Sequence, residues 1–453
     1  MSWRSKQGTD LLKSHDWLVQ RSQTVLLHGA RLIDPSTGLD KTADVLIDRG
    51  KITKIGKINR DELKGYVELD LRDKILTPGF QDMHAHFGQP GHEDRETLTT
   101  GICAAAAGGY TGVSITPDTD PYIDNAGIVK WIQDQTSGSP VNVVPVASVA
   151  RDDEGRRLTE VDDIFHMGVR VFSDTGRPAA TPEIMRRALE YMKLHNLTIS
   201  SRAQETSLAA GGVVREGPVS TRLGQKPWPS IAESMAVAKS LLLALHTGSK
   251  LHLEAVSSVE SLDLIRWARE RGVKVTCDTT PHHIALTDEA TETFDGNFKT
   301  SPPLGSKRDK DALIAAIMDG TIDAVAADHV PLTDEECLVE YSLVPDGVVG
   351  LETAVGVLAK VLGKGKPDWN KLITLLAIRP REILELPPAT IATGSTADLT
   401  IIDPEAVWTV DPARFFTKGH NTAFGGWQLP VKSLGIINRG WTLIAPDARM
   451  LVK

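Results

Sequence analysis

Short β-rich runs alternate with longer helical patterns from Lys74 onward. The runs are rich in Val, Ile and Thr, and between them lie segments whose apolar positions recur every three or four residues, such as PEIMRRALEYMKLH at 182–195. Parallel neighbouring strands need crossover connections of this length, usually helices. The pattern therefore predicts an α/β fold, a (β/α)8 TIM barrel, with strands at 75–87, 110–118, 141–150, 169–175, 197–204, 250–258, 273–283 and 322–331.

Both ends of the chain carry a different pattern. Residues 24–60 and the tail from Ala397 contain short strands separated by turn residues, and neither end has enough apolar surface for a core of its own. The sequence therefore predicts one small β-sandwich built from both chain ends. The expected divisions are an N-terminal extension at 1–23, sandwich parts at 24–73 and 389–453, and the barrel at 74–388.

Charge and composition limit the classes of partner. The net charge is −9 and no run is rich in lysine or arginine, so neither nucleic acid nor an anionic membrane is expected as a partner. No apolar stretch approaches the roughly 20 residues of a membrane span, and the N-terminal residues lack the apolar core of a secretory signal. The three cysteines form no CxxC pair, so a reduced, cytoplasmic protein is predicted.

The run TPGFQDMHAHF at 77–87 carries candidate chemistry. Asp82, His84 and His86 alternate along the expected first barrel strand, so their side chains share one face. Two imidazoles at this spacing can chelate one metal ion, commonly zinc. Histidines at this spacing also occur in ordinary strands, but a TIM barrel places its chemistry at the carboxyl ends of strands. The position of this run therefore favours a metal-dependent hydrolase.

Motifs across nearly the whole chain resemble those of the amidohydrolase superfamily, and specifically those of the bacterial long-chain dihydroorotases. They include TPGFQDMHAH, AAAAGGYTGVSITPDTDP, GVRVFSDTG, VTCDTTPHHIALTD, GTIDAVAADHVP and NTAFGGW. The resemblance implies the barrel with its flanking β-sandwich, a centre of one or two zinc ions, and opening and closing of the dihydroorotate ring in pyrimidine biosynthesis. Zinc suits this hydrolysis because it lowers the pKa of bound water to about 7.

Four of the polar groups that the resemblance implies are retained. His84 and His86 stand at the positions of the strand-one metal ligands, and Asp174 stands at that of the strand-four carboxylate. Asp328 corresponds to the strand-eight carboxylate, which binds metal and is the catalytic base if the protein is active. These four residues would form a partial metal site.

Seven further positions depart from the family pattern. Two are the histidine ligands of strands five and six, one is the arginine that holds the substrate carboxylate, and four are other site positions. In this chain the two ligand positions hold Arg202 and Ala255, and the arginine position holds Gly88. The four other site positions hold Asp118, Ser301, Gly305 and Leu332. Dihydroorotate is an anion, and a buried carboxylate needs a charged or multiply hydrogen-bonded partner. Gly88, Asp118, Ser301 and Gly305 supply no positive charge, and Asp118 adds a negative one.

Arg202 has the largest consequence for a metal ion. A guanidinium offers no free lone pair and stays protonated in proteins. At an assumed 4 Å and an effective dielectric near 20, its repulsion from a divalent ion would be roughly 8 kcal/mol. An inward Arg202 would replace the metal by hydrogen-bonding Asp174 or Asp328, whereas an outward one would lie in solvent. The sequence therefore predicts one zinc ion at most, weakly held.

Several nearby residues are expected to be structural. His252 is out of phase with position 255 on a strand, so it should be packed, and Glu254 should face the helices instead of the pocket. His282 and His283 are also expected to be structural, and the apolar residues from Leu241 to Leu245 should belong to the core.

Two functions fit this pattern. The first is a catalytically inactive dihydroorotase-like chain, similar to those that serve as structural partners of aspartate transcarbamoylase. Its expected partners are aspartate transcarbamoylase, further copies of the same chain in a homo-oligomer, or both. The second is an active zinc-dependent dihydroorotase, or another cyclic-amide hydrolase, with a divergent mononuclear site on His84, His86 and Asp328. The changes concentrate at the site, which favours the first function.

Overall fold

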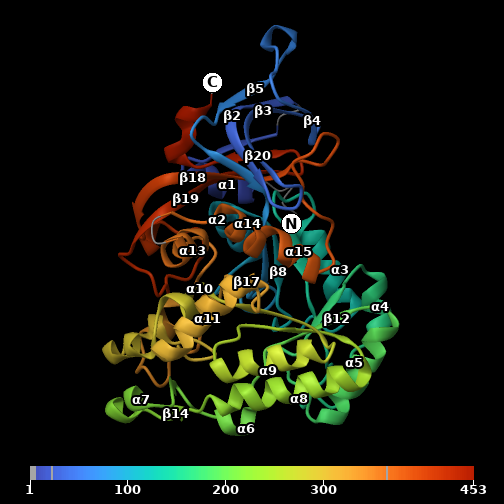
Figure 1. Ribbon diagram of the computed structural model, residues 1–453, viewed down its shortest axis with the longest axis vertical. Helices are drawn as coiled ribbons and strands as arrows, with labels where there is room; N and C mark the ends of the chain where they lie inside the picture. Colours follow the sequence, from blue (N-terminus) through green and yellow to red (C-terminus); the bar gives the residue numbers. More distant parts are fainter. Residues whose placement is uncertain (1–6, 22–23, 364–365, 453) are drawn as a thin grey trace.

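The computed structural model describes residues 7–21, 24–363 and 366–452, and its centre is a closed barrel of parallel strands (Figure 1). All eight predicted strand positions are occupied within these ranges, although the strands are shorter than predicted. They are β7 (Phe80–Ala85), β8 (Tyr110–Ile115), β9 (Asn142–Pro145) with β10 (Ala147–Ser148), β11 (Val171–Ser173), β12 (Thr198–Ser201), β15 (Lys250–Leu253), β16 (Lys274–Thr279) and β17 (Ala324–Val325).

The barrel closes through two irregular contacts. The third strand position is divided, because β9 pairs with β8 whereas β10 pairs with β11. Beyond the short β17, Ala85 forms a bridge with His329, and the backbone N–H of His86 donates to the carbonyl oxygen of His329 at 2.8 Å. This closure brings the carboxyl ends of β7 and β17 together, which is where a barrel of this class assembles its site.

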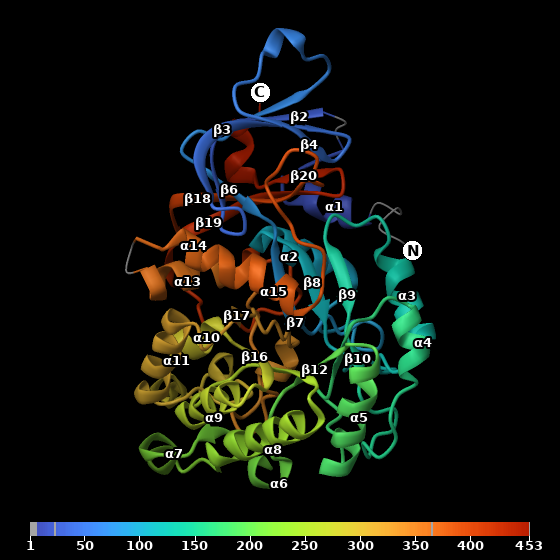
Figure 2. The same ribbon diagram turned by 45° about the vertical axis from the view of Figure 1, so that its right-hand side comes forward.

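Helices cover the outside of the barrel (Figures 1 and 2). Side-chain caps fix where several begin: Thr181 accepts from the backbone N–H of Ile184, and Ser306 accepts from that of Asp309. The longer helices are α2 (Leu98–Gly108), α3 (Ala126–Thr136), α5 (Pro182–Leu194), α8 (Ile231–Thr247), α9 (Val259–Glu270), α11 (Lys307–Asp319) and α13 (Ala354–Gly363).

The run from Leu241 to Leu245 on α8 is only partly core. Leu241 and Ala244 are buried, whereas Leu242 and Leu245 are 54% and 40% exposed. The expectation that the whole run belongs to the core is therefore wrong, because a helix turns successive residues to different faces.

The remaining elements are short. Short α-helices are α1 (Gln7–Ser14), α4 (Val161–His166), α6 (Thr206–Ala209), α7 (Pro218–Leu223), α10 (Pro281–Ala285), α12 (Asp334–Cys337), α14 (Trp369–Ile373) and α15 (Arg379–Ile383). A π-helical turn, η5 (Thr374–Ile378), joins the last two. Single 3-10 turns are η2 (Arg60–Glu62), η3 (Asp288–Thr293), η4 (Gly296–Phe298), η6 (Pro412–Arg414) and η7 (Pro446–Leu451), and a small parallel pair is β13 (Val214–Arg215) with β14 (Pro227–Trp228).

Strands from both chain ends form one sheet, called here the end sheet, which lies above the barrel in Figures 1 and 2. Within the described residues it consists of β1 (Leu18–Gln20), β2 (Thr24–Asp34), β3 (Leu39–Asp48), β4 (Lys51–Ile55), β5 (Val67–Asp70), β6 (Ile75–Pro78), β18 (Asp398–Thr409), β19 (Gln428–Asn438) and β20 (Trp441–Ile444). The two ends join where β18 pairs with β6, and the apolar core there combines residues such as Leu32, Leu76 and Leu399. The predicted β-structure from both ends is confirmed, and its pairing runs through a single sheet.

The passage from the end sheet to the barrel lies at Gly79. The strand predicted at 75–87 is two strands, since β6 pairs in the end sheet and β7 in the barrel. A Cβ at Gly79 would lie 2.0 Å from the Thr111 hydroxyl and 2.1 Å from an Asp398 carboxylate oxygen, so only glycine fits this crossing. The barrel strands thus begin at Phe80 and not at residue 74.

The predicted N-terminal extension at 1–23 also contributes to the end sheet. Its residues 1–6 and 22–23 lie outside the described residues, whereas β1 pairs antiparallel with β20. In the part of the chain that the structure describes, no helix is both long and apolar enough to cross a bilayer.

Candidate functional site

His84 lies between two buried carboxylates at the carboxyl ends of the barrel strands. Its Nδ1 is 3.0 Å from Asp328 Oδ1, and its Nε2 is 3.0 Å from Asp278 Oδ2. The same Asp278 oxygen is 2.9 Å from His252 Nε2, and the other oxygen accepts from the backbone N–H of Ala255 at 2.7 Å. Both nitrogens of His84 face acceptors, so the imidazolium form satisfies them.

Arg202 points inward from the end of β12. Its Nη2 donates to Asp328, and its Nη1 donates to the carbonyl oxygen of Ser301 at 2.9 Å. Asp174 accepts a hydrogen bond from the backbone N–H of Arg202 at 3.1 Å and another from the Ser201 hydroxyl at 2.9 Å. Of the arrangements that the sequence left open, the inward one with Asp328 as partner is the one observed.

The four central charges balance. Arg202 and His84 carry two positive charges, and Asp328 and Asp278 carry two negative ones. Burial opposes ionisation of both carboxyls, but Arg202 and His84 hold the pKa of Asp328 well below its usual value. Burial likewise disfavours the imidazolium, yet Asp278 and Asp328 raise the pKa of His84 well above its ordinary value. These four residues are therefore neutral together without any further cation.

Glu254 belongs to this network, contrary to the expectation that it faces the helices. It is almost fully buried and its carboxylate lies 3.8 Å from Nε of Arg202. The strand β15 ends at Leu253 and the backbone turns at Ala255, which has φ +51°, so strand alternation no longer applies at position 254. Its carboxylate accepts hydrogen bonds from three hydroxyls, those of Ser173, Thr175 and Ser200.

His252 and Asp278 acquire roles that the sequence reasoning missed. His252 is packed as expected, with its Nδ1 2.9 Å from the Thr276 hydroxyl, but its Nε2 contacts the carboxylate that also holds His84. Asp278 was not identified at all. Its signal was an acidic residue in an apolar strand run, VTCDTT, at the carboxyl end of the seventh strand.

Two further acidic groups at the site are buried and hard to ionise. Burial raises the pKa of Asp82 to about 7, although one of its oxygens accepts from the backbone N–H of Ala327 at 2.6 Å. Burial and the nearby charge of Glu254 raise the pKa of Asp174 to about 7. Asp82 shares the buried interior with His84 as the alternation along β7 predicted.

A cavity of about 240 Å³ lies over the network at the barrel mouth. His86 lines it, with Nδ1 2.7 Å from Asp118 Oδ2 and with a buried Nε2 that has no hydrogen-bond partner among the described residues. Burial opposes ionisation of Asp118, but the charge of His86 and this hydrogen bond lower its pKa. Five of the sequence-predicted positions line this cavity, namely His86, Gly88, Asp118, Arg202 and Ser301.

Gly88 cannot carry a side chain in this backbone. Its φ is +44°, a left-handed conformation that favours glycine. A Cβ there would lie 2.5 Å from the carbonyl oxygen of His92 and 3.2 Å from that of Glu96. The loop is therefore closed around position 88, and no cationic side chain can extend from it toward the cavity.

The other changed positions lie outside the cavity lining. Ala255 is fully buried beside Asp278. Leu332 is buried, and its backbone N–H donates to Asn421 Oδ1 at 3.0 Å. Gly305 precedes α11, and a Cβ on it would meet Asp309 Cβ at 2.8 Å. Packing and backbone hydrogen bonds thus accommodate the residues present at these three positions.

Of the two retained histidines of the TPHH run, one borders the network. Burial lowers the pKa of His282 to about 4, and its Nε2 lies 3.9 Å from Asp328 Oδ2 without a hydrogen bond. His283 is bound at both nitrogens, to the Thr280 hydroxyl and to the Pro302 carbonyl oxygen, each at 2.9 Å. His283 is structural, as expected.

The residues present do not fit a zinc ion. Zinc needs several lone pairs converging on one point, whereas both nitrogens of His84 face carboxylates and Asp328 is bound by His84 and Arg202. The guanidinium of Arg202 also brings a permanent positive charge into this position. Across residues 7–21, 24–363 and 366–452, no three His, Cys, Asp or Glu side chains are grouped so that they could hold a metal ion.

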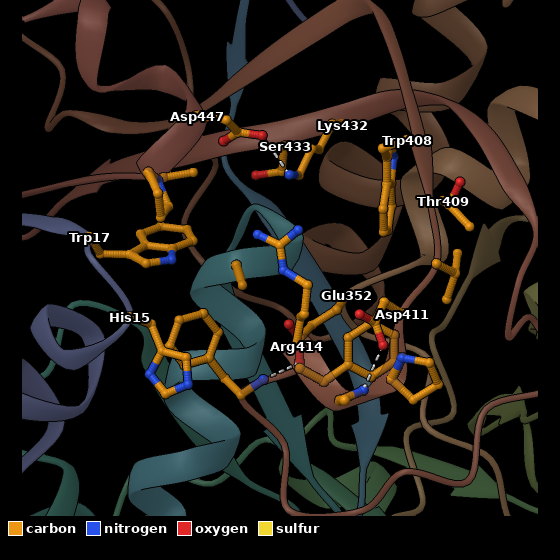
Figure 3. Close-up of a pocket in the computed structure, with 18 of the residues that line it drawn as sticks. His15, Trp17, Glu352, Trp408, Thr409, Asp411, Arg414, Lys432, Ser433 and Asp447 are labelled. Carbon is orange, nitrogen blue, oxygen red and sulfur yellow. Dashed lines mark hydrogen bonds and ion pairs between the residues drawn. The ribbon is translucent and has the colours of Figure 1, made fainter.

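A larger cavity, about 1010 Å³, lies elsewhere, where α1, α2 and the end sheet meet (Figure 3). Trp17 and Trp408 stand on opposite sides of it and Arg414 projects into it. Glu352 lies at its base and accepts from the backbone N–H groups of Phe416 and Thr417 at 2.9 and 3.3 Å. The lining contains none of the sequence-predicted site residues.

A closed (β/α)8 barrel with an end sheet and a polar network at the strand ends defines an amidohydrolase-type barrel. D-hydantoinase (dihydropyrimidinase) from Thermus sp. has this fold, with a TM-score of 0.80 at 22% identity over 92% of this chain and 94% of that one. A family model described as dihydro-orotase-like matches residues 73–261.

Curated relatives match over a longer stretch. The dihydroorotase of Syntrophus aciditrophicus (strain SB) is 40% identical over 426 residues, which cover 93% of this chain and all of that protein. The dihydroorotase of Pelotomaculum thermopropionicum is 42% identical over 403 residues, covering 89% of this chain and 94% of that protein. The chain belongs to the dihydroorotase family, as its motifs predicted.

Proposed function

We propose that this chain is a non-hydrolytic member of the dihydroorotase family that serves pyrimidine biosynthesis as a structural partner of aspartate transcarbamoylase. The observation that carries the loss of hydrolysis is the hydrogen bond from the Arg202 guanidinium to Asp328. It places a permanent cation on the carboxylate that a hydrolytic site would need as its base.

Asp328 is poorly suited to accept a proton in this setting. A general base works best when its pKa is near the operating pH, and burial together with Arg202 and His84 leaves the pKa of Asp328 well below its usual value. Its Oδ1 is already bound by Arg202 and by His84. A water molecule would find no free proton acceptor at this oxygen.

Substrate recognition is impaired independently of the base. The dihydroorotate carboxylate needs a cationic or multiply hydrogen-bonded partner. The backbone at Gly88 leaves no room for a side chain, and Asp118 adds a negative charge to the cavity wall. Arg202, which also lines the cavity, is engaged by Asp328 and Ser301.

The partner is supported by the family resemblance and by what the chain retains. It keeps the complete barrel and the end sheet, whose outer surfaces a scaffold requires, while the changed positions gather at the strand ends. A chain with this distribution of changes resembles the inactive dihydroorotase-like subunits that associate with aspartate transcarbamoylase.

Metal content and turnover, measured on one preparation of the full chain, test the loss of hydrolysis. We expect far less than one zinc ion per chain after purification in zinc-supplemented medium, and no dihydroorotate ring opening above the buffer rate. The Syntrophus aciditrophicus dihydroorotase, prepared in parallel, is the matched control. Near-stoichiometric zinc with turnover in the usual enzymatic range of about 1–10³ s⁻¹ would contradict the proposal.

The partner role has its own test. Co-expression with the aspartate transcarbamoylase of the same genome should yield a complex that survives size-exclusion chromatography. Transcarbamoylase that elutes separately at concentrations where both proteins are stable would contradict the partner role and leave the loss of hydrolysis unaffected.

One observation favours the second function, an active mononuclear cyclic-amide hydrolase. His86 Nε2 is buried at the cavity wall and has no hydrogen-bond partner in the part of the chain that the structure describes, so it retains one free lone pair or proton. The metal and turnover measurement decides between the two functions, because the second requires an ion bound with His86 as a ligand.

A further inference from the structure

The cavity where α1, α2 and the end sheet meet, called here the end-sheet cavity, is separate from the barrel site. Its volume of about 1010 Å³ matches the upper end of the range for small-molecule sites, roughly 300–1,000 Å³. None of the residues that line it lines the cavity at the barrel mouth. A ligand of the end-sheet cavity would therefore bind whether or not the barrel site is catalytic.

Two tryptophans stand on opposite sides of the end-sheet cavity (Figure 3). Trp17 is only 5% exposed and packs edge-on against Phe416, with ring centroids 5.7 Å apart. Trp408 is held by its Nε1, which donates to the carbonyl oxygen of Val431 at 2.9 Å. Both indoles are thus fixed in place and offer π surface to a flat ring, which can pack against either of them edge-on or in an offset stack.

Arg414 projects into the same cavity without a partner (Figure 3). It is the last residue of η6, which Asp411 caps by accepting from the backbone N–H of Ala413 at 3.2 Å. Within the described residues its guanidinium makes no hydrogen bond, ion pair or stacking contact with a ring. A guanidinium stays charged and presents a planar fork of donors that matches the two oxygens of a carboxylate or phosphate. The cavity therefore contains an unpaired cation of the kind that binds such groups.

Glu352 at the base of the cavity does not oppose an anion at neutral pH. Burial and the nearby charge of Glu96 raise its pKa to about 8, so below that pH the carboxyl is mostly protonated and uncharged. One of its oxygens accepts from two backbone N–H groups. The other oxygen has no hydrogen-bond partner in the described part of the chain, and the protonated group can donate from it to a polar atom of a ligand.

The remaining charges of the wall leave Arg414 unpaired. Lys432 pairs with Asp447 at 2.6 Å, so these two charges cancel. Asp16 and Asp411 are exposed, and water screens their charge. A neutral apolar ligand would strip water from the guanidinium without giving it a partner, which costs free energy, and a cation would be repelled by it. An anion is the class of ligand that compensates the charge.

We propose that the end-sheet cavity binds a planar organic anion, an aromatic or heteroaromatic ring bearing a carboxylate or a phosphate, with the acidic group on Arg414 and the ring against Trp17 or Trp408. Arg414 is exposed, so the acidic group reaches it from solvent. Glu352 donates to a polar atom of the ligand at the base of the cavity. The end sheet, which carries Trp408 on β18, thereby contributes a ligand site apart from the barrel.

Calorimetric titration of the full chain with matched pairs of compounds tests the requirement for negative charge. Naphthoate and naphthamide share a ring and nearly the same shape, but only naphthoate is an anion; adenosine monophosphate and adenosine form the second pair. We expect at least one anion to bind about 10-fold or more tightly than its neutral counterpart, because a charge-assisted hydrogen bond contributes that factor or more. Binding of naphthoate alone, or of adenosine monophosphate alone, identifies which acidic group the site takes.

Two outcomes of these titrations would overturn the proposal. The first is that neither anion binds at millimolar concentration. The second is that each anion binds only as tightly as its neutral counterpart, because the guanidinium would then play no part in recognition.

Substitutions place the bound anion in the end-sheet cavity. Arg414→Gln should weaken binding of the anion about 10-fold and leave the weaker binding of its neutral counterpart unchanged, because it removes the positive charge. Trp408→Leu should weaken binding of both compounds about fivefold or more, since it removes the contact with the ring. Arg156→Gln is the matched control and should have no effect, because Arg156 is exposed and lines neither cavity.

A ligand of the barrel site would give the opposite pattern. Arg95 lines the cavity at the barrel mouth and not the end-sheet cavity. If Arg95→Gln weakened binding of the anion and Arg414→Gln did not, the anion would bind at the barrel mouth and the proposal would be wrong. Because Arg414 is exposed and unpaired within the described residues, its replacement should leave the fold intact, which circular dichroism of the variant checks.

Discussion

Arg202 and Asp328 form a buried ion pair that joins the carboxyl ends of two barrel strands far apart in sequence. The guanidinium comes from the end of β12 and the carboxylate from just beyond β17, and Asp328 itself has φ +48°. Burial disfavours the charge of Arg202, but Asp328 and Glu254 raise its pKa further above its ordinary value. The pair therefore stays ionised across the accessible pH range, and each partner depends on the other for its charge.

Removing one partner of this ion pair should lower the free energy of unfolding strongly, whereas removing both partners should lower it by less than the sum of the two single effects. Arg202→Met, which retains length without charge, should lower the free energy of unfolding by about 3–5 kcal/mol because Asp328 is left buried and undercompensated. Asp328→Asn should cost a similar amount. The double variant should be more stable than the sum predicts by about 2 kcal/mol, since both charges are then absent. Urea denaturation followed by circular dichroism measures all four proteins.

Additive effects of the two substitutions on the free energy of unfolding would contradict this prediction. If the double variant lost the sum of the two single effects, Arg202 and Asp328 would not be coupled and the site would not be organised around their contact. Arg266→Met on the exposed face of α9 serves as the control and should change stability by less than about 0.5 kcal/mol.

Asp278 should be as important as Arg202, although nothing in the motif comparison marked it. It accepts hydrogen bonds from His252 and from the backbone N–H of Ala255, and it faces His84. Asp278→Asn removes the negative charge opposite His84 and places an amide N–H where an acceptor is needed. We expect a loss of about 3 kcal/mol in unfolding free energy, measured by urea titration. Asp263→Asn, an exposed carboxylate on α9, should be nearly neutral.

Periodicity was sufficient for the barrel and for the joining of the two chain ends. Each strand position was an apolar run followed by a helical pattern, and only one strand order closes such a series. The division at Gly79 was not visible, because Pro78 and Phe80 on its two sides are both apolar and buried, and only the contacts with Thr111 and Asp398 reveal it. Boundaries set by tertiary packing leave little trace in local sequence.

The site was partly predictable for a related reason. The contact of an inward Arg202 with Asp328 was one of three arrangements that the sequence left open, beside a contact with Asp174 and exposure to solvent. The need of a buried charge for a partner is the physical reason that an inward Arg202 meets a carboxylate. Glu254 was assigned wrongly because alternation was extended past Leu253, where the strand ends. The closed loop at Gly88 could not be inferred, since a glycine in sequence does not disclose a carbonyl oxygen 2.5 Å from its missing Cβ.

Glu352 should make stability depend on pH near neutrality. Burial and the nearby charge of Glu96 raise its pKa from 4.5 to about 8. Between these values the folded state keeps the proton that the unfolded state loses, so unfolding free energy should fall as pH rises from 4.5 to 8. The fall attributable to Glu352 should be on the order of 3 kcal/mol, reduced from the full value by the partial solvent access of the carboxyl.

Glu352→Gln isolates this contribution. The amide oxygen can still accept from the backbone N–H groups of Phe416 and Thr417, but the group cannot ionise. The variant should match the wild type near pH 4.5 and exceed it in stability at pH 8 to 9. Thermal unfolding over this pH range measures the stability of both proteins. If their pH profiles were parallel, the pKa of Glu352 would not be raised in the folded state and the prediction would be wrong.

Introducing imidazoles at positions 202 and 255 should separate the two proposed causes of inactivity, at the metal site and at the substrate carboxylate. Arg202→His combined with Ala255→His removes the guanidinium, whose repulsion from a divalent ion is roughly 8 kcal/mol at 4 Å, and adds two ligands. We expect zinc retention through dialysis, at some cost in stability because position 255 is fully buried. Arg202→Gln, which removes the charge and supplies no imidazole, should retain no zinc.

The zinc-retaining variant should still fail to open dihydroorotate. The backbone at Gly88 excludes any side chain. Arg95, the arginine that remains on the cavity wall of this variant, is paired with Glu336, so no unpaired guanidinium is left there to bind the substrate carboxylate. Metal analysis and a ring-opening assay on the same sample distinguish the two losses. Zinc without turnover is the expected result and would place a second, independent cause of inactivity at the carboxylate-binding side of the cavity. Turnover by this variant would contradict the prediction, because it would mean that only the metal was missing and that the closed loop at Gly88 still admits the substrate.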